Sequence, residues 1–160
     1  MEGLRPTPDR VRETLFNWLM HNIHDARCLD AFAGSGALGF EAFSRGAAQV
    51  VFLEESPVAH ANLKKIITEF ASPQLQLFKT DARDFLHQNP GPFDIVFLDP
   101  PFAQNYLPSC MSILAASSLL VTGGLVYLET PVHLELDETC WEEIKLKQAG
   151  QVIYGLFKKL

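Results

Sequence analysis

Four consecutive residues, Asp99-Pro100-Pro101-Phe102, bring a carboxylate, two prolines and an aromatic ring together after a largely apolar run, 93–98. Each proline fixes its own φ and lacks an N–H donor, and the residue before a proline is restricted to extended conformations. The loop is therefore stiff, and its carbonyl groups lack local partners. Its oxygens can accept the hydrogens of a planar amine while the ring stacks on the adjoining heterocycle, as methylation of an exocyclic nitrogen requires. The structural alternative is a rigid turn with a capping Asp99 and a packed Phe102.

A second stretch, Gly34-Ser35-Gly36-Ala37-Leu38-Gly39, matches G-x-G-x-x-G between a predicted strand, 28–32, and a predicted helix that ends at Ser44. Glycines in such a loop let the backbone turn sharply and approach a ligand closely. Glu54 follows Gly34 by 20 residues, at the end of the next predicted strand, where an acid can hold a ribose diol. The pattern indicates a nucleoside cofactor, although a tight turn without a ligand would use the same glycines.

Two nucleoside cofactors fit this loop in principle. A dinucleotide would place its pyrophosphate at the helix N-terminus, where the carboxylate of Asp30 would repel it. S-adenosylmethionine has no phosphate, and its ammonium group, or a water bound to it, suits Asp30. Asp81 suits an adenine amine, and the N–H of Ala82 can cap a ring nitrogen, although Asp81 equally suits the N-cap of the following helix. The sequence therefore favours S-adenosylmethionine.

Arg5, Arg10 and Arg12 fall within eight residues and form a basic cluster that could contact phosphates. The net charge of −6 argues against avid, non-specific binding to nucleic acid, but it leaves room for such a local contact. The alternative is a solvated helix face on which Asp9 and Glu13 are the partners of the arginines.

The composition, with 48% hydrophobic and 20% charged residues in a chain of 160, is typical of a globular protein. No apolar run approaches the roughly 18 residues of a transmembrane helix, and residues 1–6 have no apolar core of a signal peptide. The cysteines, Cys28, Cys110 and Cys140, are odd in number, and neither they nor the histidines show metal-ligand spacing. We predict one cytoplasmic domain over residues 1–160, with reduced thiols, no metal and no membrane contact.

The elements that must position these groups alternate between strand and helix. A first helix is predicted with Thr7 as N-cap and Pro8 at its first helical position, and its apolar face comprises Val11, Leu15, Trp18, Leu19 and Ile23. Further strands are predicted at 49–53, 75–80, 93–98 and 124–129, and further helices at 57–70, 82–87 and 105–116. Two last strands, 141–147 and 151–158, predict a hairpin around a short turn. The alternation predicts an α/β fold, a mostly parallel sheet with helices on both faces.

Parallel strands bring their carboxyl ends to one edge of the sheet, and ligands bind there at the topological switch point. Asp30, Glu54, Asp81 and Asp99 all lie at or just past predicted strand ends. We therefore expect four acids on one rim, a coincidence that packing explains poorly.

Asp30-Ala31-Phe32-Ala33-Gly34-Ser35-Gly36, together with Asp99-Pro100-Pro101-Phe102, resembles the class I S-adenosylmethionine-dependent amino-methyltransferases. Gly3-Leu4-Arg5-Pro6-Thr7 and residues 9–19, DRVRETLFNWL, resemble more specifically the bacterial 16S ribosomal RNA (guanine(966)-N2)-methyltransferases. The resemblance covers essentially the whole chain. It implies a Rossmann-like, seven-stranded, mostly parallel sheet with a C-terminal antiparallel hairpin, and a guanine 2-amino target in the 16S rRNA of the small ribosomal subunit.

The resemblance also assigns roles to residues. Asp99 and the Pro100 carbonyl would accept the amine hydrogens, Pro101 would stiffen the loop and Phe102 would stack on the base. The cofactor would be bound by Asp30, Phe32, Gly34, Ser35, Gly36, Glu54, Asp81, Ala82 and Asp99. RNA would be bound by Arg5, Thr7, Arg10 and Arg12, from an N-terminal arm and helix, 1–24, near the active site. We expect a monomer that acts on the assembled or assembling small subunit.

Two positions depart from the family pattern. Met1 and Glu2 stand where family members usually carry a basic, glycine-containing segment, so that segment is expected to be absent and RNA affinity to be reduced. Ser56 stands where the family often has an acid two residues beyond the ribose-binding Glu54, and Glu55 is the neighbouring substitute.

Other functions stay open at this point. The Asp99–Phe102 loop would serve equally for adenine or cytosine amines in DNA or for a glutamine side chain in a protein. An NAD-dependent oxidoreductase would use the glycine loop but leave the Asp99–Phe102 loop unexplained. A non-catalytic nucleotide-binding or ribosome-assembly module is the remaining alternative.

Overall fold

The computed structural model describes residues 8–88, 90–101 and 106–160. Strands and helices alternate over most of the chain: α1 (Asp9–Trp18), β1 (Arg27–Asp30), α2 (Ala37–Ser44), β2 (Gln49–Leu53), α3 (Pro57–Phe70), β3 (Leu75–Phe78), α4 (Ala82–His87), β4 (Phe93–Leu98), α5 (Leu107–Ala116), β5 (Leu120–Thr130), β6 (Trp141–Ala149) and β7 (Val152–Lys159). The strands form one sheet in the order β3-β2-β1-β4-β5-β7-β6. Pairing is parallel from β3 to β5 and antiparallel for β7, which confirms the predicted sheet and its C-terminal hairpin.

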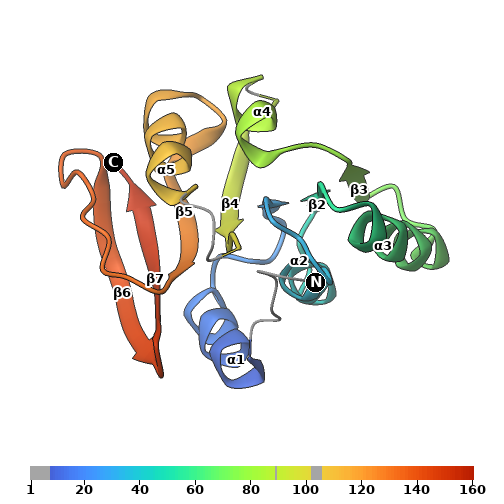
Figure 1. Cartoon of the computed structure of the whole chain (residues 1–160), viewed down its shortest axis with the longest axis horizontal. Coiled ribbons are helices and arrows are strands. Elements are labelled where there is room, and N and C mark those ends of the chain that lie inside the picture. Colours follow the sequence, from blue (N-terminus) through green and yellow to red (C-terminus); the bar gives the residue numbers. More distant parts are fainter. Residues whose placement is uncertain (1–7, 89, 102–105) are drawn as a thin grey trace.

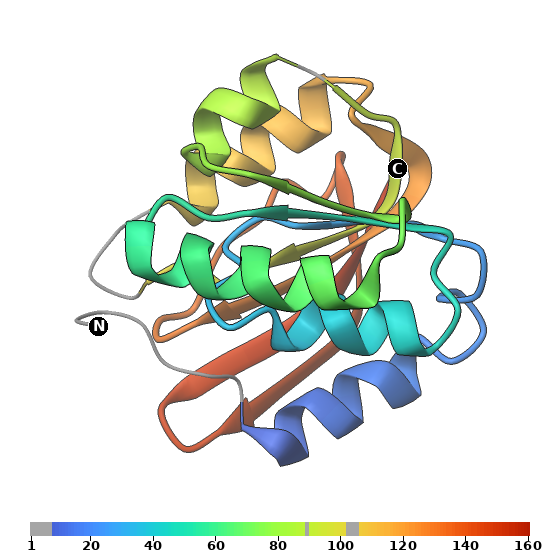
Figure 2. The same ribbon diagram turned by 90° about the vertical axis from the view of Figure 1, so that its right-hand side faces the viewer.

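Helices cover both faces of this sheet, as Figures 1 and 2 show: α1, α2 and α3 lie on one side, and α4 and α5 on the other. The period of two in the strands produces this arrangement, because successive side chains point to opposite faces. In β4, Ile95 and Phe97 join the core under α1 to α3, whereas Val96 and Leu98 join the core under α4 and α5. Both layers are closely packed, so the strands are rigid supports for the loops at their ends.

The predicted bounds of β2, α3, α4 and β4 are confirmed at both ends, whereas β1, β3, β6 and β7 differ from their predictions by one or two residues at one or both ends. Pro8 is the N-cap of α1 and not its first helical residue, since its carbonyl accepts the first helical N–H, from Arg12, at 3.0 Å while its own ψ is 146°. The β5 strand begins at Leu120, four residues earlier than predicted. Its register shifts between the pairs Phe93–Leu120 and Ile95–Leu125, and Gly123, with φ at +82°, absorbs the distortion.

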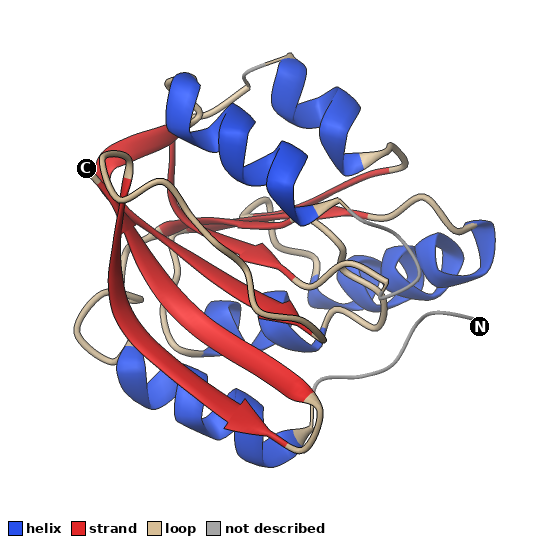
Figure 3. Cartoon of the chain, turned by 60° about the vertical axis from the view of Figure 1, so that its left-hand side comes forward, coloured by secondary structure: helices blue, strands red, loops and turns tan. Residues whose placement is uncertain are grey.

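The C-terminal hairpin of β6 and β7 extends beyond the parallel strands and reaches α1 (Figure 3). Trp18 of α1 stacks on Tyr154 of β7, with ring centroids 5.5 Å apart. Two residues earlier in the same helix, Phe16 packs against Phe97 of β4, with ring centroids 5.9 Å apart. These contacts hold α1 against the sheet, close to the strand ends that carry the predicted site.

Candidate active site

The carboxyl ends of the parallel strands meet at one edge, and backbone hydrogen bonds beyond the strands join the loops that leave them. Ala31 N–H donates to Phe97 O at 3.1 Å, Ala33 N–H to Leu53 O at 3.0 Å, and Glu54 N–H to Phe78 O at 3.1 Å. The predicted acids follow from this arrangement: Asp30 ends β1, Glu54 and Asp99 come directly after β2 and β4, and Asp81 caps α4 after β3.

The switch point of the sheet lies between β1 and β4. These strands are neighbours, with Asp30 in register with Phe97, but the chain continues from β1 toward β2 and from β4 toward β5. The glycine loop leaves β1 and the Asp99 loop leaves β4, so the two loops start side by side. A crevice between such loops is the usual ligand site of an open α/β sheet.

Each position of the G-x-G-x-x-G stretch that carries a glycine differs in what a side chain there would meet. Gly34 has φ at +56°, and a Cβ there would meet nothing within 4 Å, so this side of the loop faces open space. Gly36 has φ at +82°, and a Cβ would meet the Phe40 ring at 2.5 Å. A Cβ on Gly39 would overlap the ring of Phe52 at 2.3 Å, which makes this glycine the contact between α2 and β2. The loop is thus turned and packed by Gly36 and Gly39, while Gly34 leaves room for a ligand.

Two buried carboxylates hold the glycine loop in place. One oxygen of Glu54 accepts the Gly34 N–H at 2.8 Å, and its other oxygen accepts the Ser56 N–H, also at 2.8 Å. Asp30 accepts the Gly39 N–H at 3.0 Å in the first turn of α2. Both acids are nearly inaccessible to solvent. The loop therefore has its shape before any ligand arrives.

The charge of Asp30 is poorly compensated. Burial raises the pKa of Asp30 from 3.8 to about 7; the Gly39 hydrogen bond opposes this shift, and the neighbouring charge of Glu54 adds to it. A cationic ligand group beside Asp30 would relieve the cost of its negative charge. A phosphate in the same place would increase that cost.

Asp81 is the N-cap of α4, as the sequence allowed. Its carboxylate accepts the Arg83 N–H at 2.7 Å, and the Arg83 guanidinium binds the same carboxylate at 3.2 and 3.0 Å. The Arg83 side chain is the main reason why the pKa of Asp81 lies below its ordinary value. The guanidinium also lies 4.2 Å from the ring centroid of Tyr106, which stacks on Phe32 at 5.5 Å. The stacked side chains of Phe32, Tyr106 and Arg83 thus connect the segments that follow β1, β4 and β3. Ala82, next to Asp81, is buried.

The loop after β4 begins at the rim. Asp99 and Pro101 are partly exposed and Pro100 is buried, and Asp99 has a polar partner within the chain. Phe102 lies outside the described residues, as do Arg5 and Thr7 of the N-terminal arm. Phe32 is partly exposed and Ser35 is exposed, on the same loop as Gly34.

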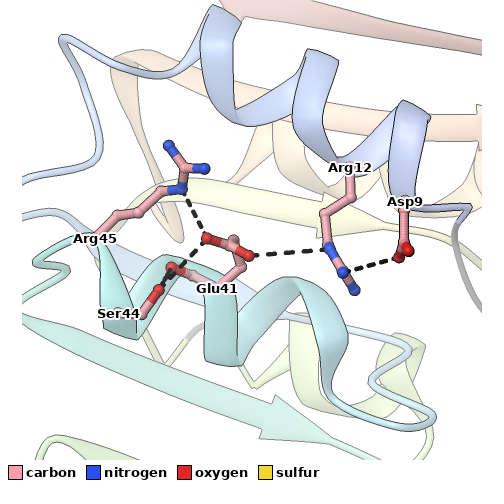
Figure 4. A network of polar contacts seen from close by, with 5 residues as sticks. All are labelled: Asp9, Arg12, Glu41, Ser44 and Arg45. Carbon is pink, nitrogen blue, oxygen red and sulfur yellow. Dashed lines mark hydrogen bonds and ion pairs between the residues drawn. The ribbon is translucent and has the colours of Figure 1, made fainter.

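The two described arginines of the basic cluster differ. Arg12 binds Asp9 at 2.9 Å and lies 3.9 Å from Glu41 of α2, which also binds Arg45 at 2.8 Å (Figure 4). Asp9 is thus a partner of the cluster, as one prediction allowed, and Glu41 is a partner that the sequence did not indicate. Arg10 is exposed and has no ion pair with another described residue. Arg10 is therefore the better placed of the two for a phosphate.

The rim carries a fifth acid that was not predicted from the sequence. Glu129, near the end of β5, is 2% exposed and accepts a hydrogen bond of 2.8 Å from the Tyr127 hydroxyl. A signal was present, because the predicted strand 124–129 itself ended on this acid. Within the described ranges no three His, Cys, Asp or Glu side chains are grouped so that they could hold a metal. None of the helices in those ranges is long and apolar enough to cross a membrane.

Comparison with known proteins places this geometry in a family. The family model described as "Conserved hypothetical protein 95" matches residues 1–158. The chain belongs to this family. It is 46% identical over 162 residues to the ribosomal RNA small subunit methyltransferase D of Haemophilus influenzae, with 98% of this chain and 84% of the relative covered. It is 42% identical over 159 residues to the protein of the same name from Escherichia coli K12, with 98% and 80% covered.

A similar protein of solved structure shares the fold. A putative methyltransferase from Escherichia coli superposes with a TM-score of 0.91 at 42% identity, covering 98% of this chain and 88% of that one. The family resemblance and the class I methyltransferase fold inferred from the sequence are both confirmed.

Proposed function

We propose that this chain transfers a methyl group from S-adenosylmethionine to the exocyclic N2 of a guanine in the 16S rRNA of the small ribosomal subunit, and that it acts as a monomer. One observation carries the proposal: the glycine loop and the Asp99 loop leave neighbouring strands at the switch point, joined by the Ala31–Phe97 hydrogen bond of 3.1 Å. The loop proposed to bind the cofactor and the loop proposed to hold the amine therefore start side by side at one edge of the sheet. The identity to relatives named as small subunit rRNA methyltransferases supports the choice of substrate.

The residues present fit S-adenosylmethionine better than a dinucleotide. Glu54 would hold the ribose diol, Asp30 the ammonium group, and Asp81 with Ala82 the adenine, while Gly34 gives the ligand room. Two buried acids hold one loop, and burial raises the pKa of Asp30 to about 7, which favours a cation and disfavours a pyrophosphate. Bound there, the cofactor supplies an electrophilic methyl group on a sulfonium.

The chain's own contribution is to orient the amine. The lone pair of guanine N2 is delocalised into the ring, which makes the nitrogen a poor nucleophile. Asp99 and the Pro100 carbonyl would accept the two N2 hydrogens and direct the lone pair toward the methyl group. The N2 proton becomes acidic as the new bond forms, so a carboxylate is a sufficient acceptor. Most of the rate enhancement then comes from orientation and from charge complementarity to the transition state.

RNA would reach this loop with the target base turned out of its helix. Arg10 would contact a phosphate, which positions the RNA without reading its sequence. Arg12 would contribute less, because its charge is already balanced by Asp9 and Glu41. Phe102 would stack on the base, and Arg5 and Thr7 would add contacts from the arm.

Labelled methyl transfer tests the proposal. Small subunits from cells that lack this modification, free 16S rRNA and DNA are each offered with labelled S-adenosylmethionine, and the products are digested to nucleosides. We expect N2-methylguanosine from the ribosomal substrates alone. Label in DNA or protein, or in another nucleoside, would replace this function with one of the other amine methylations.

Calorimetry tests the cofactor separately. S-adenosylhomocysteine should bind in a one-to-one ratio, and NAD should show no heat of binding at the same concentration. Preference for NAD would contradict the role given to Asp30.

A further inference from the structure

A buried polar pair on β5 has no role in the chemistry described so far. Tyr127 is fully buried and Glu129 is 2% exposed, and the Tyr127 hydroxyl donates to Glu129 Oε2 at 2.8 Å. Burial of a carboxylate is costly unless hydrogen bonds and neighbouring charges compensate it. Buried ionic groups often stabilise a fold no better than apolar residues of similar volume. The pair is therefore a candidate for a functional role.

Its position is beside the loop that holds the amine. In the parallel pairing of β4 with β5, Leu98 is in register with Leu128. Asp99, directly after β4, and Glu129 of β5 are the residues that follow this pair. Phe97 and Tyr127 lie on the same face of the sheet, with ring centroids 6.5 Å apart. The ends of β4 and β5 thus place two carboxylates on neighbouring chains, at the edge of the sheet face that α1 to α3 cover.

The Tyr127 hydroxyl fixes the direction of the Glu129 carboxylate. Burial, followed by the charge and the hydrogen bond of Glu129 and then by the charge of Asp99, raises the pKa of Tyr127 above its ordinary value. The hydroxyl therefore stays protonated and remains a donor. A carboxylate oriented in this way is prepared to accept a hydrogen from a ligand.

We propose that Glu129 selects guanine by accepting the N1–H hydrogen of the target base while Asp99 accepts a hydrogen of the N2 amine. The inference rests on the proposed function. The N1–H and the N2 amine lie side by side on the Watson–Crick edge of guanine, which matches two carboxylates on neighbouring strands. Adenine and cytosine carry an acceptor nitrogen beside their amine, and a carboxylate facing that nitrogen would repel it. Glu129 therefore acts both by attraction of guanine and by rejection of the other bases.

An analogue of the target base isolates this contact. In 2,6-diaminopurine the 2-amine is retained, but N1 is an acceptor in place of a donor. An RNA hairpin carrying either base at the target position is methylated by the wild-type chain, by Glu129→Gln and by Tyr127→Phe. We expect wild type to prefer guanine by about 100-fold in kcat/KM, the effect of one hydrogen bond to a charged group.

Glu129→Gln should reverse the contact, because the Tyr127 hydroxyl holds the amide oxygen and leaves the amide NH2 to face the base. The NH2 can donate to the N1 of diaminopurine but cannot accept the N1–H of guanine. The variant should lose about 100-fold in kcat/KM on guanine and little on diaminopurine, so that the preference disappears. Tyr127→Phe keeps the ring and removes only the hydroxyl, and it should narrow the preference by a smaller factor of about 3 to 10. Affinity for S-adenosylhomocysteine should be unchanged in both variants.

The outcomes separate the two proposals. An equal loss on both bases in Glu129→Gln, or a wild-type chain that methylates both bases equally, would overturn the role of Glu129 and leave the methyltransferase function intact. A wild-type chain that methylates neither hairpin, nor intact subunits, would overturn the proposed function itself. Circular dichroism shows whether Glu129→Gln folds. If it does not, the inference is tested by the other two chains. It is contradicted if wild type has equal kcat/KM on guanine and diaminopurine, or if Tyr127→Phe prefers guanine as strongly as wild type does.

Discussion

The two halves of the rim hold their carboxylates in different ways. On the side of β1, β2 and β3, each acid accepts a backbone N–H close by in sequence or space: Asp30 from Gly39, Glu54 from Gly34 and Ser56, and Asp81 from Arg83. On the side of β4 and β5, Glu129 is held by a side chain, the Tyr127 hydroxyl. Backbone donors fix the carboxylates of the proposed cofactor side as part of the fold. On the proposed substrate side, the contact between Tyr127 and Glu129 joins two side chains, which can be changed without changing the fold.

Asp99→Ala should give the largest effect and should leave the cofactor side untouched. We expect methyl transfer to fall by about 1,000-fold, because the amine loses its charged acceptor, while affinity for S-adenosylhomocysteine stays within about threefold. Single-turnover rates and calorimetry measure the two quantities. An equal loss of methyl-transfer rate and of affinity for S-adenosylhomocysteine would show that the proposed cofactor and substrate sides are not independent.

Glu54→Ala should weaken cofactor binding by disturbing the glycine loop. It removes the acceptors of the Gly34 and Ser56 N–H groups, so the glycine loop loses its shape before binding. We expect S-adenosylhomocysteine to bind about 30-fold more weakly and the free energy of unfolding to fall by about 1–3 kcal/mol. The control is Glu69→Ala, at an exposed position of α3, which should change neither value. A normal affinity in Glu54→Ala would mean that the loop is set by its glycines alone.

Asp30 makes the cofactor side sensitive to pH. Because burial raises the pKa of Asp30 to about 7, the folded chain keeps this proton over a range in which the unfolded chain has lost it. The free energy of unfolding should therefore fall as the pH rises from about 4 to 7. Asp30→Asn keeps an acceptor for Gly39 but cannot ionise, so its stability relative to wild type should increase by about 1–3 kcal/mol between pH 4 and pH 8.

Urea unfolding at several pH values provides this measurement. Glu69→Gln, at an exposed position on α3, is the control and should show no such trend. A constant difference between Asp30→Asn and wild type would show that Asp30 is already compensated in the free chain.

Substitutions of Arg10 and Arg12 should have the smallest effects on RNA binding, and they should differ from each other. Arg10→Glu should weaken RNA binding by about 3- to 10-fold and reduce its salt dependence, since one phosphate contact is lost. Arg12→Glu should weaken RNA binding less and destabilise α1 more, because it places a third acid beside Asp9 and Glu41. Binding titrations at several salt concentrations, with thermal unfolding, distinguish the two. Equal salt slopes would contradict the difference drawn between the arginines.

The sequence predicted the cofactor side better than the substrate side, for a physical reason. Gly34, Gly36 and Glu54 lie at fixed spacings because the backbone itself forms that loop, so the spacing can be read. The contacts of Arg12 with Glu41 and of Tyr106 with Arg83 and Phe32 depend on which side chains meet in space. Glu41 lies on another helix, Tyr106 stacks on Phe32 from a distant loop, and no spacing along the chain indicates either contact. Glu129 could have been found, since it ended a predicted strand as the other acids did.

The packing of α1 against the hairpin has an optical consequence. The chain has only two tryptophans. Trp18 stacks on Tyr154 in the layer of α1 to α3, whereas Trp141 is buried in the layer of α4 and α5. Each face of the sheet therefore contains one intrinsic fluorophore. Replacing either tryptophan with phenylalanine leaves a chain whose emission reports on a single layer, so the loosening of one layer can be observed while the other is still intact.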